Sequence, residues 1–312
     1  MTRSSSSYYN VLKKVECLRD VIAEKFFANT HGELNSEEVG DRYKAVFYAF
    51  LLAAAKRKKL QDKLKDKIRD RIGVRLLWSA AIDELSGWRS KSCSISNLLE
   101  SLDEYINRPA VNGEDYLDRA IKDLKESIRK VDSVIVYDAM SVIEELVISA
   151  YLKAKRGLDS SFLTMLMNLP GLTRGVTSQL QVTDHPATLR EVAKRVARDL
   201  GADDKEPKYY NIVDRVVHEK GLVIELFVND IAANIKGIAE DIAKVAKSEQ
   251  SRVVILSDHG YDIIACPDGD VDVYVTHGFR EGAASDCPSG RSALPLLLLS
   301  RFAFYMGVLG RV

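Results

Sequence analysis

Apolar residues recur every three or four positions through the first part of the chain, which is the spacing of one buried face of an α-helix. One such face consists of Leu12, Val15, Leu18, Ile22 and Phe26. A second helix is expected to begin at Asn35 or Ser36, because both are favoured helix-capping residues. Helical spacing continues through 98–106 and 116–128. The pattern predicts an all-helical N-terminal domain over residues 1–128.

The pattern changes near residue 130, where short β-branched runs begin to alternate with helical stretches. Three runs read as strands, each leading to an aspartate: 133–137, 209–213 and 252–257. An amphipathic segment over 222–247 predicts a long helix, and 262–276 predicts a β-hairpin. Residues 129–312 are therefore expected to form an α/β domain with a mostly parallel sheet flanked by helices.

Charge adds one feature to this picture. The chain has 45 basic and 45 acidic residues, but Lys and Arg are concentrated in 56–75. Alternating charges at helical spacing predict a solvated, ion-paired helix. The alternative is a surface that binds nucleic acid or a protein partner, since a basic helix can neutralise phosphates.

The four cysteines and the apolar segments indicate the cellular compartment in which the protein is expected. The cysteines are widely scattered without a CxxC pair, which does not indicate a disulfide scaffold and favours a reducing cytoplasm. The N-terminal residues lack the apolar core of a signal peptide. The most apolar segment, 294–306, contains Pro295 and Arg301 and is too short for a membrane span. We therefore expect a cytoplasmic protein that does not enter a membrane.

Aspartates end the three predicted strands, at Asp138, Asp214 and Asp258. Ligands of such sheets bind beyond the carboxyl ends of the strands, so these carboxylates are expected at one edge. Histidines accompany them: His218 follows Asp214 by four residues and His259 follows Asp258 directly.

His277, before Gly278, is expected to return to the same edge at the end of the hairpin, whereas His31 and His185 are assigned to no site. Imidazole nitrogens and carboxylate oxygens are common zinc ligands. The residue types therefore predict a zinc site, with manganese as the second candidate.

Thr173 precedes a helix-compatible stretch and allows two interpretations. It could be a plain helix cap. Beside a metal ion it could instead be a nucleophile, because the ion would lower the pKa of the hydroxyl group. Arg174 and Arg280 are the basic residues nearest in sequence to these elements and are candidates to contact phosphate, or alternatively to form surface ion pairs.

Five segments, in this order, carry a resemblance to a known family. They are Val134-Ile-Val-Tyr-Asp138, Leu169-Pro-Gly-Leu-Thr173, Tyr210-Asn-Ile-Val-Asp-Arg-Val-Val-His218, Leu256-Ser-Asp-His-Gly260 and Thr276-His-Gly278. Residues 130–312 thus resemble the alkaline phosphatase superfamily and, within it, the PglZ domain group. The sequence departs from the family pattern at Ala139, where glycine is common, and also at Ser141 and Phe279.

The resemblance implies an alkaline-phosphatase-like sheet and two zinc ions per chain. One ion would be held by Asp138, Asp258, His259 and the Thr173 oxygen, and the other by Asp214, His218 and His277. The implied reaction is attack of Thr173 on phosphorus, followed by hydrolysis of the phosphothreonine.

Two functions are therefore expected from the sequence. The first is a metal-dependent phosphatase or phosphodiesterase, whose phosphoester substrate could be a nucleotide or a nucleic acid. The alternative is a scaffold or regulatory component of a phage-defence or nucleic-acid-associated assembly with little or no turnover, docked through the basic helix 56–75.

Overall fold

Helices dominate the first part of the chain, as predicted. The computed structural model describes residues 3–28, 30, 32–57, 64, 69–87, 93–106, 122, 125–126, 131–167, 188–202, 206–248, 252–266, 272–278 and 293–309. The N-terminal elements are α1 (Arg3–Ile22), the π-helical η1 (Ala23–Ala28), α2 (Ser36–Arg57), the 3-10 turn η2 (Leu76–Trp78), α4 (Ser79–Ser86) and α5 (Ile95–Ile106). Most of the helix expected over 116–128 lies outside the described residues.

The start of α2 shows why the helix begins at that point in the sequence. The side chain of Asn35 accepts a hydrogen bond from the backbone N–H of Glu38, at 2.8 Å. The Glu38 carboxylate accepts in return from the backbone N–H of Asn35, also at 2.8 Å. This reciprocal capping satisfies backbone donors that the first turn of a helix leaves unpaired. Of the two predicted caps, Asn35 is the one observed.

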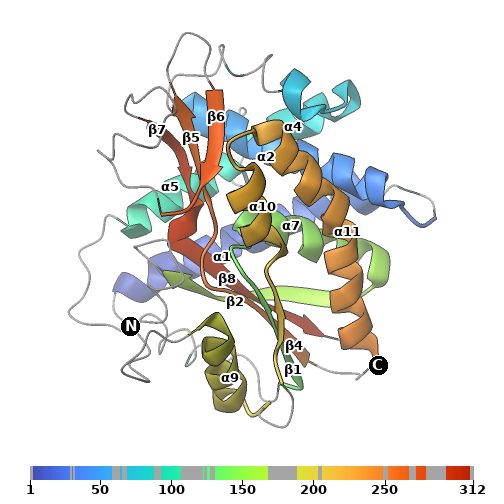
Figure 1. Cartoon of the computed structure of the whole chain (residues 1–312), viewed down its shortest axis with the longest axis vertical. Coiled ribbons are helices and arrows are strands. Elements are labelled where there is room, and N and C mark those ends of the chain that lie inside the picture. Colours follow the sequence, from blue (N-terminus) through green and yellow to red (C-terminus); the bar gives the residue numbers. More distant parts are fainter. Residues whose placement is uncertain are drawn as a thin grey trace.

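A five-stranded sheet forms the centre of the second part, with the order β2-β8-β4-β1-β3 (Figure 1). Its strands are β1 (Ser133–Tyr137), β2 (Asp159–Met167), β3 (Lys208–Tyr210), β4 (Arg252–Ser257) and β8 (Phe302–Leu309). β1 pairs in parallel with β3 and β4, whereas β8 pairs antiparallel with β2 and β4. The predicted α/β fold with helices flanking a sheet is confirmed. The expectation of a mostly parallel sheet is wrong, because the C-terminal strand enters antiparallel and makes the sheet mixed.

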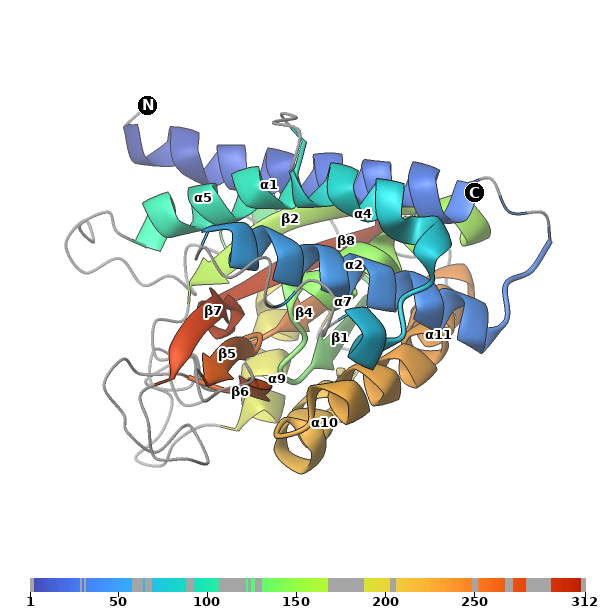
Figure 2. The same ribbon diagram turned by 90° about the horizontal axis from the view of Figure 1, so that it is seen from above.

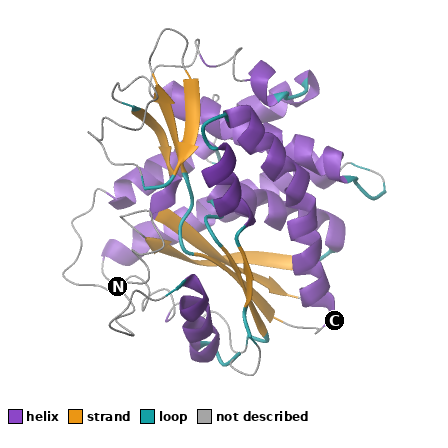
Figure 3. Cartoon of the chain, in the orientation of Figure 1, coloured by secondary structure: helices purple, strands orange, loops and turns teal. Residues whose placement is uncertain are grey.

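Helices cover both faces of this sheet (Figures 2 and 3). On one face lie α7 (Val142–Tyr151), which continues into the π-helical η3 (Leu152–Arg156), and α11 (Ile224–Ser248), together with the N-terminal helices. On the other face, α9 (Leu189–Asp199) buries one side against apolar side chains of β1, β4 and β8. The short α10 (Ile212–Lys220) lies between β3 and α11.

A second, three-stranded antiparallel sheet has the order β6-β5-β7. It consists of β5 (Asp262–Cys266), β6 (Asp272–Thr276) and β7 (Leu294–Leu298). The predicted hairpin over 262–276 is confirmed by the pairing of β5 with β6. The apolar segment 294–306 forms β7, the 3-10 turn η4 (Leu299–Arg301) and the start of β8. Of the helices in the described part of the chain, none combines the length and the apolar character needed to cross a bilayer.

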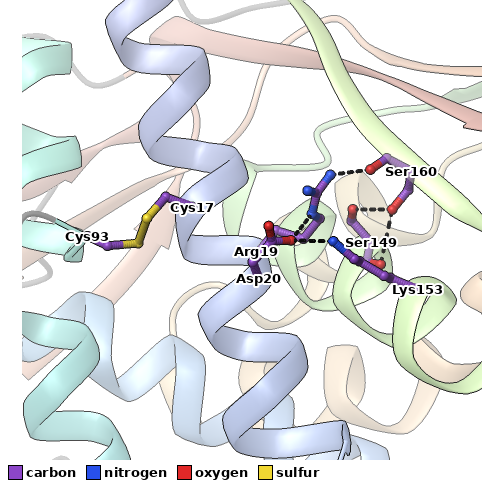
Figure 4. Close-up of polar contacts among 7 residues, drawn as sticks. All are labelled: Cys17, Arg19, Asp20, Cys93, Ser149, Lys153 and Ser160. Atoms are coloured by element: carbon purple, nitrogen blue, oxygen red, sulfur yellow. Dashed lines mark hydrogen bonds and ion pairs between the residues drawn. A yellow bond between two sulfur atoms is a disulfide. The ribbon is translucent and has the colours of Figure 1, made fainter.

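The N-terminal helices pack directly on the α/β part of the chain. One buried cluster of apolar side chains contains residues of α1, α2, α4 and α5 as well as residues of β1, α7, α11 and β8. Polar contacts reinforce this packing (Figure 4). Arg19 of α1 donates to the backbone carbonyl of Ser160 on β2, and Lys153 donates to Asp20 at 2.8 Å.

A disulfide bond joins Cys17 on α1 to Cys93 just before α5, with a Cα–Cα distance of 5.8 Å (Figure 4). Cys266 is disulfide-bonded as well. The scattered spacing of the cysteines did not indicate these disulfide bonds. Cys17 and Cys93 are 76 positions apart in sequence but come together because α1 and α5 pack side by side. The cytoplasmic location remains a prediction.

Two adjacent glutamates in α7 are fully buried but differ in their partners. Glu144 accepts hydrogen bonds from the hydroxyl groups of Tyr43 and Tyr261, at 2.6 and 2.7 Å, and from the backbone and side chain of Ser141. Neither carboxylate oxygen of Glu145 has a hydrogen-bond partner among the described residues. Burial, together with the neighbouring charge of Glu144, raises the pKa of Glu145 well above its usual value.

Glu145→Gln is expected to stabilise the protein relative to the wild type by an amount that grows with pH. Since the folded-state pKa of Glu145 is raised, the folded protein keeps a proton that the unfolded chain releases above about pH 4.3. The wild type should therefore lose up to about 1.4 kcal/mol of unfolding free energy per pH unit between the two pKa values, whereas glutamine does not titrate. Urea unfolding at several pH values between about 5 and 8 measures this difference.

Glu144→Gln is the matched control. It replaces an acceptor oxygen that faces hydrogen-bond donors, so it should lower the unfolding free energy by about 1–3 kcal/mol. If the difference between Glu145→Gln and the wild type did not change with pH, Glu145 would not be the titrating group.

Candidate metal centre

The first cluster of candidate ligands lies at the carboxyl ends of two neighbouring strands. β1 and β4 pair in parallel with Tyr137 opposite Ser257, so Asp138 and Asp258 follow their strands side by side. His259 comes next in the chain, and ligand atoms of the three side chains all lie within 4.8 Å of one another. Nε2 of His259 is 3.4 Å from Asp258 Oδ2 and 3.9 Å from Asp138 Oδ1. We call Asp138, Asp258 and His259 the inner cluster.

The loop after β4 fixes the orientation of the His259 ring. Nδ1 of His259 lies 2.7 Å from the backbone carbonyl oxygen of Gly260. A proton on Nδ1 donates to this oxygen and leaves Nε2 as the atom that can bind a metal ion. Gly260 is required here, because a Cβ atom would lie 2.8 Å from the Leu299 carbonyl oxygen and 3.0 Å from Cβ of Ser141.

The loop after β1 has an unusual backbone at Ala139. This residue has φ +60°, in the left-handed region that costs an L-residue about 1–2 kcal/mol. The conformation directs the Ala139 N–H toward Asp258 Oδ1, at 3.4 Å. Alanine therefore adopts a glycine-like conformation at the position where the resembled family commonly has glycine.

The second cluster consists of Asp214, His218 and His277, and we call it the outer cluster. Asp214 and His218 lie one turn apart on α10, so they project on the same side of that helix. Oδ1 of Asp214 is 3.3 Å from Nε2 of His218 and 3.2 Å from Nε2 of His277, which follows β6. Residues 214–218 form one turn of helix, the conformation in which a spacing of four brings two side chains to the same side.

The prediction of a strand over 209–213 ending in Asp214 is wrong. β3 ends at Tyr210, and Asp214 lies in the first turn of α10. Gly221 then brings the end of α10 against β6, where its carbonyl oxygen accepts from the Val275 N–H at 2.8 Å. Val275 is two residues before His277, so this hydrogen bond holds the end of α10 beside the end of the β5–β6 hairpin.

The two clusters adjoin one another through His277. Its ring centroid is 5.0 Å from that of His218 in the outer cluster and 5.0 Å from that of His259 in the inner cluster. The six candidate ligands therefore form one continuous group suited to two ions. Exposure differs between the clusters: the His259 side chain is 3% exposed and that of His218 is 68% exposed.

Several features of the clusters fit bound divalent cations. Asp138 Oδ1 is buried and makes no hydrogen bond with any described residue, a costly state that a coordinated ion would relieve. Burial and then the charge of Asp258 raise the pKa of Asp138 to about 6, as expected where carboxylates converge. Carboxylate oxygens and imidazole nitrogens are typical zinc ligands. Three ligands in each cluster leave a coordination position free for substrate or water.

Tyr209 is a site residue that the sequence analysis missed. Its hydroxyl group donates a hydrogen bond to Asp138 Oδ2 at 2.6 Å. Burial and this hydrogen bond raise the pKa of Tyr209, so the phenol is protonated and is a donor at neutral pH. A possible signal was its place in the strand that precedes the Asp-x-x-x-His segment, but nothing in the sequence indicated that this strand pairs with β1.

Thr173, Arg174 and Arg280 lie outside the described residues, so the nucleophile and the phosphate contacts stay predictions.

Most of the basic segment 56–75 also lies outside the described residues. Within its described part, Arg71 pairs with Glu225 and Asp272, and Arg75 pairs with Asp41. These ion pairs agree with the solvated, ion-paired interpretation of the segment.

Comparison with known protein families and with curated proteins finds no family and no curated sequence that matches this chain.

Proposed function

We propose that this protein is a metal-dependent phosphoester hydrolase, a phosphatase or a phosphodiesterase, with two zinc ions per chain. The observation that carries the proposal is the junction of the two clusters at His277, which brings six candidate metal ligands together beside the ends of β1, β4 and β6. Manganese is the second candidate for the metal, because it accepts the same oxygen and nitrogen ligands. The resemblance to the PglZ domain group supports the same reaction.

In this proposal the inner cluster would hold one ion and the outer cluster the other. Two adjacent divalent ions supply Lewis-acid stabilisation of the entering and leaving oxygens of a phosphoryl group. The described residues would orient the metal ligands. The Gly260 carbonyl sets the His259 tautomer, and the helical turn of α10 aligns Asp214 with His218.

The exposure of the two clusters indicates where the substrate would enter. The Asp258 side chain is fully buried, whereas His218 is largely open to solvent. A phosphoester would therefore approach from the side of the outer cluster. Thr173 is the proposed nucleophile: its oxygen would bond to phosphorus as the ester alcohol leaves, and water would then hydrolyse the phosphothreonine, releasing the phosphate product and regenerating Thr173. Arg174 and Arg280 are proposed to contact the phosphate oxygens.

The proposal is tested by measuring the metal content of the purified protein together with hydrolysis of an aryl phosphomonoester and its diester analogue. We expect about two zinc ions per chain, from the two clusters, and turnover that a chelator abolishes. The ratio of the two rates distinguishes a phosphatase from a phosphodiesterase. His277→Ala should reduce both metal content and turnover, because His277 touches both clusters. His185→Ala, at a histidine assigned to no site, is the control.

Absence of both metal and turnover, even after zinc is added back, would refute the hydrolase. The scaffold function would then be the better hypothesis. Salt-sensitive nucleic-acid binding that is lost on neutralising Lys56, Lys58 and Lys59 would support it.

A further inference from the structure

We infer that Tyr209 is a positioning residue of the inner cluster, which holds Asp138 so that one carboxylate oxygen faces the ion. The inference rests on the proposed function, because it assumes that the inner cluster binds a metal. It concerns a residue outside the two ligand sets, on the edge strand β3.

The two oxygens of Asp138 have different surroundings. Oδ2 accepts the hydrogen bond of the Tyr209 phenol at 2.6 Å. Oδ1 is buried, makes no hydrogen bond within the described part of the chain and lies 3.9 Å from Nε2 of His259. The phenol therefore occupies one oxygen and leaves the other directed into the cluster, which favours coordination of an ion through Oδ1 alone.

The backbone of β3 sets this arrangement. β3 pairs in parallel with β1, with Tyr209 opposite Val136 and Tyr210 opposite Tyr137. The carbonyl oxygen of Tyr210 then accepts from the Asp138 N–H at 2.8 Å, so the strand that carries Tyr209 also holds the backbone of the ligand. The position of the phenol relative to Asp138 is thus determined by strand register.

Tyr210 provides a control within the same strand. Successive side chains of a strand point to opposite faces. Accordingly, Tyr210 stacks on Tyr137 with ring centroids 5.0 Å apart and an interplanar angle of 14°. Removing its hydroxyl group changes a tyrosine next to Tyr209 without touching the hydrogen bond to Asp138.

The expected effect follows from the role of hydrogen bonds around metal ligands. Partners that orient a coordinating carboxylate typically change metal affinity by about 10–100-fold when they are removed. Tyr209 is 38% exposed, so loss of its hydroxyl group should leave little buried space and should not disturb the core.

The test compares Tyr209→Phe and Tyr210→Phe in the full-length, metal-free protein. Each is titrated calorimetrically with Zn²⁺, and with Co²⁺ while its visible absorption is recorded. The wild type and Tyr210→Phe should show two binding events. Tyr209→Phe should weaken one event by about 10–100-fold and change the Co²⁺ spectrum of that site, with the melting temperature of the metal-free protein unchanged.

The His218→Ala variant identifies the site that is affected. It removes a ligand of the outer cluster, so Tyr209→Phe and His218→Ala should weaken different events. The inference is overturned if Tyr209→Phe binds both ions like the wild type, if Tyr210→Phe weakens binding equally, or if Tyr209→Phe and His218→Ala weaken the same event. Two ions bound without any hydrolysis would count against the proposed function alone, whereas a wild type that binds no ion would overturn both.

Discussion

Thr173→Ala is expected to abolish phosphoester hydrolysis while the protein still binds two metal ions. The six candidate ligands of the described clusters remain intact in this variant, so metal content should be unchanged. The hydroxyl group that is proposed to attack phosphorus would be missing. Removal of a nucleophile from a site whose residues act as a unit lowers kcat by at least about 1,000-fold. The measurement is steady-state hydrolysis of an aryl phosphate at full metal occupancy.

Thr177→Ala is the matched control, since it removes a threonine hydroxyl four residues further along the same segment. This variant should keep both turnover and metal. A Thr173→Ala variant with wild-type activity would rule out the nucleophile assignment. A variant that loses metal as well as activity would show that the Thr173 oxygen, which the family resemblance places on the inner ion, is needed to retain that ion.

Gly221→Ala is expected to disrupt the outer cluster through the backbone. A Cβ atom at this position would overlap the carbonyl oxygen of Val275 on β6. Since backbone cannot rotate away as a side chain can, α10 and β6 must separate, and Asp214 and His218 must move away from His277. Overpacking of this kind costs about 3 kcal/mol. We expect a lower unfolding free energy together with selective loss of one of two bound ions.

Gly237→Ala serves as the control for this substitution. Gly237 lies within α11, and a Cβ atom there would meet no atom of the described residues within 4 Å beyond its chain neighbours and the helix's own nearby backbone. Alanine should therefore stabilise the helix, by up to about 1 kcal/mol, and leave metal binding unchanged. The steric argument would fail if Gly221→Ala retained wild-type stability and both ions in urea unfolding and metal titration.

The buried Glu144 links the helical part of the chain to the candidate metal centre. Tyr43 reaches Glu144 from α2, Tyr261 reaches it from the loop after His259, and Ser141 reaches it from the loop after Asp138. One carboxylate thus joins an N-terminal helix to both loops that carry the inner cluster. The N-terminal helices therefore help to hold the ligand loops in place.

The inner cluster was largely predictable from the sequence. The β-branched runs 133–137 and 252–257 are too apolar for a surface location, and each is followed at once by Asp138 or Asp258. Two neighbouring parallel strands necessarily bring their carboxyl ends together, so prediction of the strands also predicted the meeting of these aspartates.

The outer cluster was predictable only in its residue types. The short segment 209–213 has a strand-like composition, but its pairing with β1 ends at Tyr210 and the chain turns into α10 at Ile212. Which conformation such a short apolar run adopts is decided by the surfaces it packs against rather than by its own preference. The four-residue spacing of Asp214 and His218 still indicated a shared face once a helix was assumed.

The sequence by itself determined the chemical character of the site: three aspartates and three histidines, most of them at the ends of predicted elements, and an α/β part that follows a series of helices. These features depend on local periodicity and residue type, which can be read from the sequence without knowledge of the fold. Tertiary structure alone decided that the sheet is mixed, that His277 joins the two clusters, that Tyr209 meets Asp138 and that Cys17 meets Cys93. Each of these joins residues distant in sequence, and such contacts depend on how whole elements pack, which no local pattern records.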